Sequence, residues 1–262
     1  MFKIGLKLWS NNENYVPHAK RLYEKKVYDY IELYIVPNTH EKYIKIWRDL
    51  EIPFIIHCTH FMHGFNLAAP EKLQSNVKIF AEVKAFCDEL HGKYIIFHPG
   101  IEGTLESSVE QINTIYDKRL LVENKPYISM LNDYCRGSSY EELEIIINSC
   151  NVGFCLDIPH AINTAIHLEK DYYIYPERLL TLSPKVIHIS DGNIKTIHDK
   201  HLNIGEGDFN FLKIKKIITK ASNAEYITIE TCKNCDDLND FAIDIKRMKE
   251  MLDIRDFEGI SK

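Results

Sequence analysis

Eight short runs of β-branched and aromatic residues recur along this chain, and charged segments with a helical period separate them. The runs cover residues 3–9, 30–35, 53–57, 94–98, 120–124, 152–157, 186–191 and 226–231. Each run is almost continuously apolar, which is typical of strands that are buried on both faces of a parallel sheet. This pattern favours an α/β fold, in which helices cover a parallel sheet.

The segments between these runs carry apolar residues at the spacing of amphipathic helices. They cover residues 16–26, 40–50, 70–90, 108–116, 140–148, 209–219 and 238–252, and the less regular stretch 162–182 has room for one or two short helices. Pro70 suits the first turn of a helix, and Ser138 or Ser139 before Glu141 indicates a helix start. In a chain of 262 residues, eight strands alternating with helices predict one (β/α)8 TIM barrel over residues 1–262. A doubly wound sheet is the alternative.

Composition argues against some classes of protein. The 32 basic and 38 acidic residues give a net charge of −6, so the totals indicate no strongly basic surface for nucleic acid. No apolar run approaches the length that spans a bilayer, and residues 1–6 do not resemble a signal peptide. The seven cysteines have irregular spacing that is typical of reduced thiols, so we expect a cytoplasmic protein with no membrane partner.

Six consecutive strands end in a histidine or a carboxylate. These residues are His57, His98, Glu123, Asp157, His188 and Glu230. All strands of a parallel barrel end at the same rim, so we expect the six side chains to meet there. Burying them without partners would be costly, whereas imidazoles and carboxylates together bind divalent cations such as Zn²⁺. The pattern predicts a metal site; the alternative is that each residue is an ordinary polar residue at a loop start.

The connections after two of these strands add three more candidate ligands. His160 follows Asp157 by three residues, where a turn would fold it back toward the rim. Asp199 and His201 lie two apart after the seventh strand, and in an extended segment they would point to the same side. The total is then nine candidate ligands, which is too many for one ion and suits a cluster of two or three.

Several short segments, taken in order, resemble the motif series of endonuclease IV (AP endonuclease family 2), within the xylose-isomerase-like TIM barrels. They are His98-Pro99-Gly100, Glu123-Asn124, Asp157-Ile158-Pro159-His160, His188-Ile189-Ser190-Asp191, Asp199-Lys200-His201 with Gly205-Glu206-Gly207, and Glu230-Thr231. The resemblance implies a DNA-repair hydrolase that uses three zinc ions to cleave DNA 5′ to abasic sites. It implies that all nine positions are metal ligands. The first histidine of the family is matched by His57 or by His60, and both remain candidates.

Charge separates the two chemistries that the resemblance suggests. Three divalent ions with four carboxylates leave the site at about +2, which suits an anionic phosphate and an activated water. The wider superfamily also contains sugar isomerases and epimerases, which hold one metal on a set that would be Glu123, Asp157, His188 and Glu230 here. One ion on three carboxylates leaves about −1, which suits a neutral polyol. A barrel that binds metal without turnover is a third interpretation.

The expected hydrolase uses two or three Zn²⁺ ions, although Mn²⁺ or Fe²⁺ also accepts histidine and carboxylate ligands. Glu123 and Glu230 are the candidate catalytic residues, and we expect Glu123 to orient the attacking water. The candidate substrate-binding residues are Lys7, Trp9, Lys125 and Arg136.

Two departures from the endonuclease IV pattern concern the substrate. Only residues 35–39, with no arginine, separate the second strand from the next helix, where that family usually carries a longer loop that helps to open DNA. The first strand reads Leu6-Lys7-Leu8-Trp9-Ser10 in place of the usual Gly-x-His-x-Ser. Further rim cations are few, namely Lys195 and Lys200. We therefore expect the substrate to be abasic DNA or else a smaller phosphoester or sugar phosphate.

Some residues near the expected rim have two interpretations each. Four aromatic side chains would stack on a base or sugar, or would pack the barrel mouth: Trp9, Phe61, Phe65 and Tyr127. Glu32 would contact substrate or form a buried pair with Lys7. The lone C-x-x-C of Cys232 and Cys235 favours a structural role over zinc binding or redox work.

Overall fold

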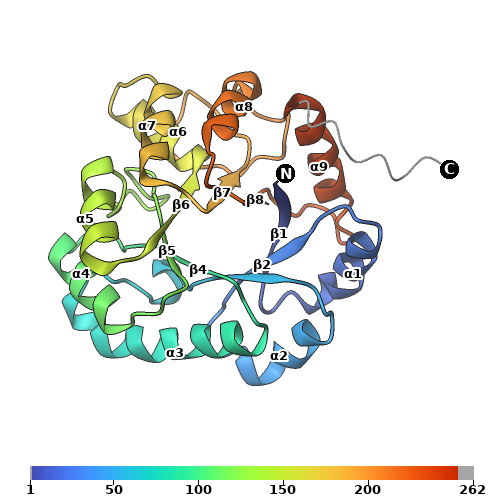
Figure 1. Ribbon diagram of the computed structural model, residues 1–262, viewed down its shortest axis with the longest axis horizontal. Helices are drawn as coiled ribbons and strands as arrows, with labels where there is room; N and C mark the ends of the chain where they lie inside the picture. Colours follow the sequence, from blue (N-terminus) through green and yellow to red (C-terminus); the bar gives the residue numbers. More distant parts are fainter. Residues whose placement is uncertain (1, 253–262) are drawn as a thin grey trace.

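The computed structural model describes residues 2–252 and contains a closed barrel of eight parallel strands, in the order β1-β2-β3-β4-β5-β6-β7-β8. Helices surround the barrel on its outside (Figure 1). β1 pairs with β2 on one side and with β8 on the other, which closes the sheet. The predicted (β/α)8 barrel is confirmed, and the doubly wound alternative is wrong because such a sheet is open and leaves two edges.

The strands are β1 Lys3–Trp9, β2 Tyr30–Tyr34, β3 Phe54–His57, β4 Ile95–Phe97, β5 Leu120–Glu123, β6 Gly153–Asp157, β7 Val186–Ile189 and β8 Tyr226–Ile229. The α-helices within residues 2–252 are α1 Val16–Glu24, α2 His40–Arg48, α3 Leu73–Glu89, α4 Leu105–Thr114, α5 Tyr140–Cys150, α6 Ile158–His167, α7 Ile174–Leu179, α8 Phe211–Lys220 and α9 Asn239–Leu252. Short 3₁₀ turns are η1 Glu13–Tyr15, η2 Phe61–His63, η3 Pro70–Lys72 and η4 Leu180–Leu182. The predicted strands agree with the observed ones to about two residues at each end.

Two helices begin earlier than the hydrophobic pattern predicts, and a capping residue explains each. α4 begins at Leu105 rather than at 108, because the Thr104 hydroxyl accepts a hydrogen bond from the Ser107 N–H (3.0 Å). α6 begins directly after β6 rather than at 162, because the Asp157 carboxylate accepts the His160 N–H (2.6 Å). The candidate ligand His160 therefore lies in the first turn of a helix, not in a loop that folds back.

Two other helix starts predicted from the sequence agree with the structure or lie close to the observed ones. Ser139 caps α5, since its hydroxyl accepts the Glu142 N–H (3.1 Å). Pro70 begins the 3₁₀ turn η3, and α3 follows it. The predicted domain extends to residue 262, and its last part, 253–262, lies outside the described residues.

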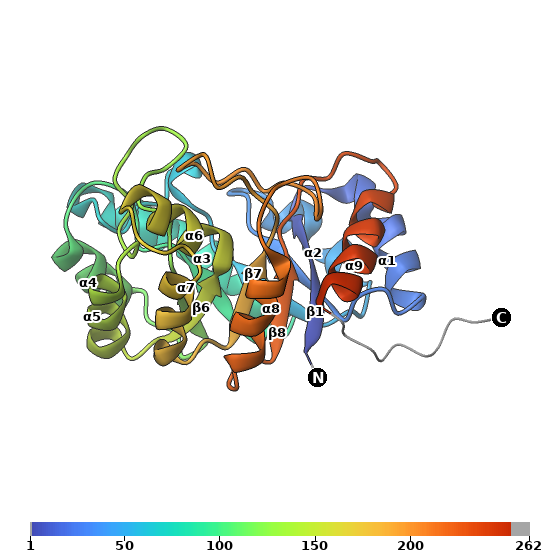
Figure 2. The same ribbon diagram turned by 90° about the horizontal axis from the view of Figure 1, so that it is seen from above.

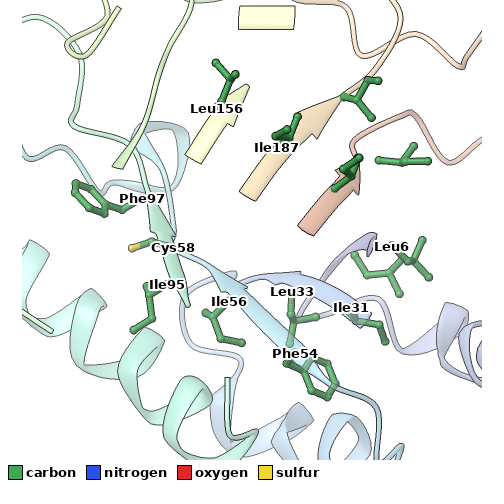
Figure 3. Close-up of a cluster of buried hydrophobic side chains, with 14 of the residues drawn as sticks. Leu6, Ile31, Leu33, Phe54, Ile56, Cys58, Ile95, Phe97, Leu156 and Ile187 are labelled. Carbon is green, nitrogen blue, oxygen red and sulfur yellow. The ribbon is translucent and has the colours of Figure 1, made fainter. Parts of the chain in front are cut away.

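Side chains along the strands alternate between two cores. Those that point outward pack against the helices, and Figure 3 shows Phe54, Ile56 and Ile95 directed toward helical segments. Inward side chains form a smaller cluster inside the barrel, made of Tyr30, Ile55, Ile96, Leu121, Cys155, Val186 and Tyr226. Gly5 is required in this interior layer, because a Cβ on it would stand 2.3 Å from the Tyr30 ring. The apolar interior layer forms the floor beneath the rim.

The carboxyl ends of the strands lie opposite the end of the barrel from which the chain starts (Figure 2). The connections that leave this rim after β5 and β7 are long, with residues 124–139 and 190–210. No helix within residues 2–252 is long and apolar enough to cross a membrane. All seven cysteines are free thiols.

Candidate metal centre

The barrel interior changes from apolar to polar over two residues of each strand. Inward side chains lie two apart on a strand, so the second residue after each member of the apolar interior layer points into the barrel nearer to the rim. These residues are Glu32, His57, His98, Glu123, Asp157, His188 and Thr228. In the parallel register Asp157 pairs with His188, and His188 pairs with Thr228. Strand geometry alone therefore collects the polar side chains in one layer.

The first ligand group consists of His57, His98 and Glu123, at the ends of β3, β4 and β5. Nε2 of His57 and Nε2 of His98 lie 3.0 and 3.1 Å from the same oxygen, Oε2 of Glu123. One ligand atom from each residue lies within 4.8 Å of the other two. This is the composition of a three-residue divalent-metal site with an open position.

The second group consists of His160, Asp199 and His201. Nε2 of His160 and Nε2 of His201 lie 3.2 and 2.6 Å from Oδ2 of Asp199. The expectation that Asp199 and His201 lie in an extended segment is wrong, because His201 has a φ of +47°. The two side chains still meet, since the loop turns between them and the His201 N–H reaches Oδ1 of Asp199 (3.3 Å).

The third group consists of Asp157, His188 and Glu230, at the ends of β6, β7 and β8. Nδ1 of His188 lies 3.1 Å from Oε1 of Glu230 and 3.8 Å from Oδ2 of Asp157. Glu123 connects the three groups, because its Oε2 lies 3.6 Å from His188 Nδ1 and its Oε1 lies 3.1 Å from His160 Nδ1. The nine predicted ligands thus form one continuous cluster.

Each histidine directs one ring nitrogen into this cluster, and four of the five have the other nitrogen held by a neighbour. Three donate Nδ1–H to a backbone carbonyl: His57 to Cys58 (2.8 Å), His160 to Asn124 (2.9 Å) and His201 to Glu230 (2.7 Å). His188 has the reverse arrangement, with Nε2 3.0 Å from the Glu32 carboxylate and Nδ1 facing the cluster. Such outer hydrogen bonds fix the tautomer and the ring orientation of metal-binding histidines.

Unsatisfied buried atoms test whether these residues fit cations. Nδ1 of His188 and Oδ2 of Asp199 are both buried and make no hydrogen bond of good geometry, although charged side chains surround them. Buried polar atoms usually find partners, and both atoms belong to ligand groups. The two atoms belong to different ligand groups, and a divalent cation in each group would satisfy its atom, so the donor sets fit divalent cations.

Mutual electrostatics shifts the pKa values of the cluster. Burial favours the neutral form of Glu123, but the neighbouring His98 and His188 outweigh it and hold the pKa of Glu123 well below its usual value. Burial also opposes protonation of His160 and His201, yet the adjacent carboxylates, Asp157 and Asp199 respectively, raise their pKa values to about 10 and about 9. The carboxylates of the cluster therefore favour the protonated forms of His160 and His201 when no metal is bound.

The Gly205-Glu206-Gly207 segment holds the loop that carries the second group. Oδ2 of the buried Asp191 accepts the N–H groups of Gly205 (2.9 Å) and Gly207 (3.0 Å). A Cβ on Gly207 would stand 2.1 Å from the Gly192 carbonyl oxygen, so the close approach requires glycine. The two-residue spacing of Gly205 and Gly207 thus has a structural cause.

The model of the family described as "Xylose isomerase-like TIM barrel" matches residues 16–251. The chain belongs to the xylose isomerase-like TIM barrel family. It is 28% identical over 207 residues to a protein of Aquifex aeolicus named "Probable endonuclease 4", a match that covers 69% of this chain and 71% of that protein. The family predicted from the sequence is confirmed.

Two solved structures resemble this chain over almost its whole length. A D-tagatose 3-epimerase-like protein has a TM-score of 0.73 at 21% identity, with 97% of this chain and 99% of that chain covered. Endonuclease IV from Thermus thermophilus has a TM-score of 0.66 at 19% identity, with 95% and 99% covered. At these identities the likeness establishes the fold and leaves the reaction to be argued from the site.

A cavity of about 550 Å³ opens beside the metal-ligand cluster of this family member. Of the four candidate substrate-binding residues, Lys7, Trp9 and Lys125 line it. Arg136 is not among its lining residues, and its guanidinium donates to Glu142 and to the carbonyls of Glu102 and Gly103. Lys7 lies 2.5 Å from both Glu32 and Glu230, so the buried pair anticipated for Glu32 is present.

His57 and His60 were the two candidates for the first histidine ligand, and the structure places them in different surroundings. His57 belongs to the first ligand group, whereas His60 belongs to no ligand group within residues 2–252. His60 caps η2, its ring stacks on His98 with centroids 5.9 Å apart, and burial lowers its pKa to about 3. His60 lines the cavity without approaching Glu123 closely enough for an ion pair.

Among the other rim residues, Trp9 and Phe61 line the cavity. Phe65 is buried in the core, and Tyr127 stacks on His167 with ring centroids 4.4 Å apart. Sequence reasoning did not select Lys233, which lines the cavity from the segment after β8. Lys233 follows the candidate ligand Glu230 by three residues, within the C-x-x-C segment, and this closeness to a ligand was the signal that could have identified it.

Proposed function

We propose that the chain is a metal-dependent phosphodiester hydrolase with three cation positions. Five overlapping groups of three within residues 2–252 could hold a cation, and the observation that supports the proposal most directly is that three of these groups together contain each of the nine candidate ligands once. The groups are His57, His98 and Glu123; Asp157, His188 and Glu230; and His160, Asp199 and His201. A single-metal isomerase needs only Glu123, Asp157, His188 and Glu230, and it gives the remaining histidines and Asp199 no task.

The charge of the cluster fits an anionic substrate. Lys7 and Glu32 neutralise each other, so the ligand carboxylates Glu123, Asp157, Asp199 and Glu230 set the balance. Three divalent ions on these four carboxylates leave about two positive charges. When bound, Zn²⁺ or a similar ion would polarise the phosphoryl oxygens and lower the pKa of the attacking water.

Residues of the chain provide orientation for the reaction. Glu123 directs one oxygen toward the first group and the other toward His160, so its carboxylate is placed to orient a water at the centre of the cluster. Glu230 is held from one side by Lys7 and from the other by His188. Water adds to phosphorus and gives up a proton to solvent, the bond to the leaving oxygen breaks, and the leaving alkoxide takes up a proton from solvent to depart as an alcohol.

The similarity to the protein named "Probable endonuclease 4" also supports the proposal and suggests abasic DNA as one substrate to test. The test is to load the protein with zinc, count the metal by mass spectrometry, and assay a duplex with one abasic site alongside small phosphodiesters. We expect about three zinc ions per chain and hydrolysis of at least one substrate.

Glu123→Gln should abolish hydrolysis and leave the fold intact, whereas Glu225→Gln, at an exposed carboxylate just before the amino end of β8 and so away from the rim, should have no effect. One bound ion together with epimerisation of a sugar and no phosphoester hydrolysis would overturn the proposal. Hydrolysis that persists in Glu123→Gln would remove Glu123 from the mechanism.

A further inference from the structure

Lys125 is a buried cation that faces the cavity without an acidic partner. It is 9% exposed, and no carboxylate within residues 2–252 forms an ion pair with it. Its Nζ instead lies 3.4 Å from Nε2 of His98, a ligand atom of the first group. Once a cation takes the lone pair of that nitrogen, Lys125 loses this acceptor. A buried ammonium without an acceptor is costly, so the position calls for an anionic ligand.

The other two lysines that line the cavity are already engaged. Lys7 is paired with Glu32 and Glu230, and Lys233 donates to the Thr231 carbonyl at 2.6 Å. Lys195 and Lys200 are exposed and do not line the cavity. Recognition of duplex DNA normally uses several lysines or arginines along the backbone. The cavity offers a place for a single phosphate rather than a track for a strand.

Exposed apolar side chains surround the same opening. We define the apolar rim as Trp9, Met62 and Met130, which line the cavity and are 43%, 64% and 54% exposed. They come from three separate places, the end of β1, the turn η2 and the connection after β5. The Trp9 ring is held in place by Tyr34, with centroids 5.2 Å apart. Large apolar side chains gathered in the open around a cavity indicate a ligand surface.

Building on the proposed function, we propose that the cavity binds a compact phosphodiester with a single phosphate. The anionic oxygen of that phosphate contacts Lys125 beside the first ligand group, and an aromatic or apolar substituent lies against the apolar rim. A cavity of about 550 Å³ has the size that small-molecule sites commonly have. The substrate class is therefore a small aryl- or nucleoside-like phosphodiester and not a duplex.

The first test uses binding, so that it does not depend on turnover. Zinc-loaded protein is titrated with phenylphosphonate and with methylphosphonate by calorimetry. We expect phenylphosphonate to bind more tightly, and Trp9→Ala to remove most of the difference. Lys125→Met, which removes the charge and keeps most of the length of the side chain, should weaken the binding of both ligands by about 10- to 100-fold, as loss of a hydrogen bond to a charged group does. Zinc content should stay constant in both variants.

Lys195→Met serves as the matched control, because this lysine lies on the same rim but is exposed and outside the cavity. It should bind both phosphonates as the unaltered protein does. An abasic duplex that binds more tightly than phenylphosphonate, without dependence on Lys125 or Trp9, would overturn the inference. Unchanged phosphonate affinity in Lys125→Met would do the same.

The second test uses turnover with bis-p-nitrophenyl phosphate and methyl p-nitrophenyl phosphate. Lys125→Met should raise KM for both by about 10- to 100-fold. If neither ester is hydrolysed but phosphonate binding still depends on Lys125, the proposed hydrolase function fails and the ligand class is supported. If both esters are hydrolysed equally well by Lys125→Met, the ligand class fails and the hydrolase function stands.

Discussion

Oε2 of Glu32 lies 3.0 Å from Nε2 of His188, and both side chains are fully buried. Glu32 also receives hydrogen bonds from Lys7 and from the Thr228 hydroxyl, so its position is fixed from three sides. The Glu32 carboxylate accepts a hydrogen bond from the Nε2–H of His188, so Nδ1 of His188 faces Asp157 and Glu230. Glu32 is therefore a positioning residue for a metal ligand.

Glu32→Gln should weaken metal binding without removing a ligand. The amide cannot hold the His188 ring as a carboxylate does, and loss of such an outer partner typically lowers metal affinity by about 10- to 100-fold. Competition with a chromogenic chelator measures the affinity of each zinc ion. We expect one ion to be weakened, and Glu225→Gln, at an exposed carboxylate, to leave all of them unchanged. Equal zinc affinities in Glu32→Gln and the unaltered protein would contradict this role.

A second prediction distinguishes the two candidate first histidines. His57 Nε2 lies 3.0 Å from Glu123, whereas the Nδ1 of His60 accepts the Met62 N–H within its own turn (3.3 Å). His57→Asn should reduce the zinc content by about one ion per chain. His60→Asn, at a neighbouring position on the same cavity, is the matched control and should retain the full content. The reverse result would make His60 the ligand.

Much of this site follows from topology and strand period. A parallel barrel brings every strand end to one rim, and alternation directs His57, His98 and Glu123 inward together. The loop ligands were harder to place. Asp199 and His201 meet because His201 has a left-handed backbone conformation that Asp191 and the glycines support from a distance in the sequence. Residue spacing contains no information about that turn.

The ring-nitrogen assignments were also beyond the sequence. Whether a histidine uses Nδ1 or Nε2 depends on which acceptor lies behind the ring, and for His188 that acceptor is Glu32, 156 residues earlier. For Arg136, the sequence suggested a role that the observed contacts of the side chain do not support. As one of the few cations expected at the rim it was a candidate substrate contact, but its guanidinium donates to Glu142 and to two backbone carbonyl groups.

Metal binding should release protons. His160 and His201 have pKa values raised to about 10 and about 9, mainly because carboxylates outweigh the effect of burial, so both are charged at pH 7.5 without metal. A zinc ion on the second group must displace both protons, so about two are released for that ion. Calorimetric titrations in buffers of different ionisation enthalpy measure this number, and His201→Asn should lower it by about one. A buffer-independent enthalpy would contradict the prediction.

The same two histidines contribute to the change in stability of the metal-free protein with pH. A pKa raised on folding stabilises the native state fully below the unfolded-state value of about 6.5. The contribution is lost as the pH rises through about 9 for His201 and about 10 for His160. Thermal unfolding of the metal-free protein should therefore occur at lower temperature at pH 10 than at pH 7. The zinc-loaded protein, in which metal has replaced these protons, should show a smaller change.

The buried carboxylate of Asp191 supports the loop that carries the second ligand group. Its oxygens accept N–H groups from Gly205, Gly207 and Gly192. Asp191→Asn would turn an amide N–H₂ toward some of these donors and leave them unsatisfied, at about 1–3 kcal/mol in the free energy of unfolding. The loop should then exchange its amide hydrogens faster, and the zinc ion on Asp199 and His201 should be lost first.

Hydrogen exchange over residues 192–209 together with zinc content measures both effects of Asp191→Asn. The matched control is Asp208→Asn, since Asp208 lies in the same loop, is exposed and accepts a single N–H from Ile194 (2.8 Å). That variant should exchange nearly as the unaltered protein does and keep its zinc. If Asp191→Asn lost zinc equally from all three groups, the carboxylate would support the barrel as a whole. Selective loss would establish that the loop carries one cation position independently of the other two.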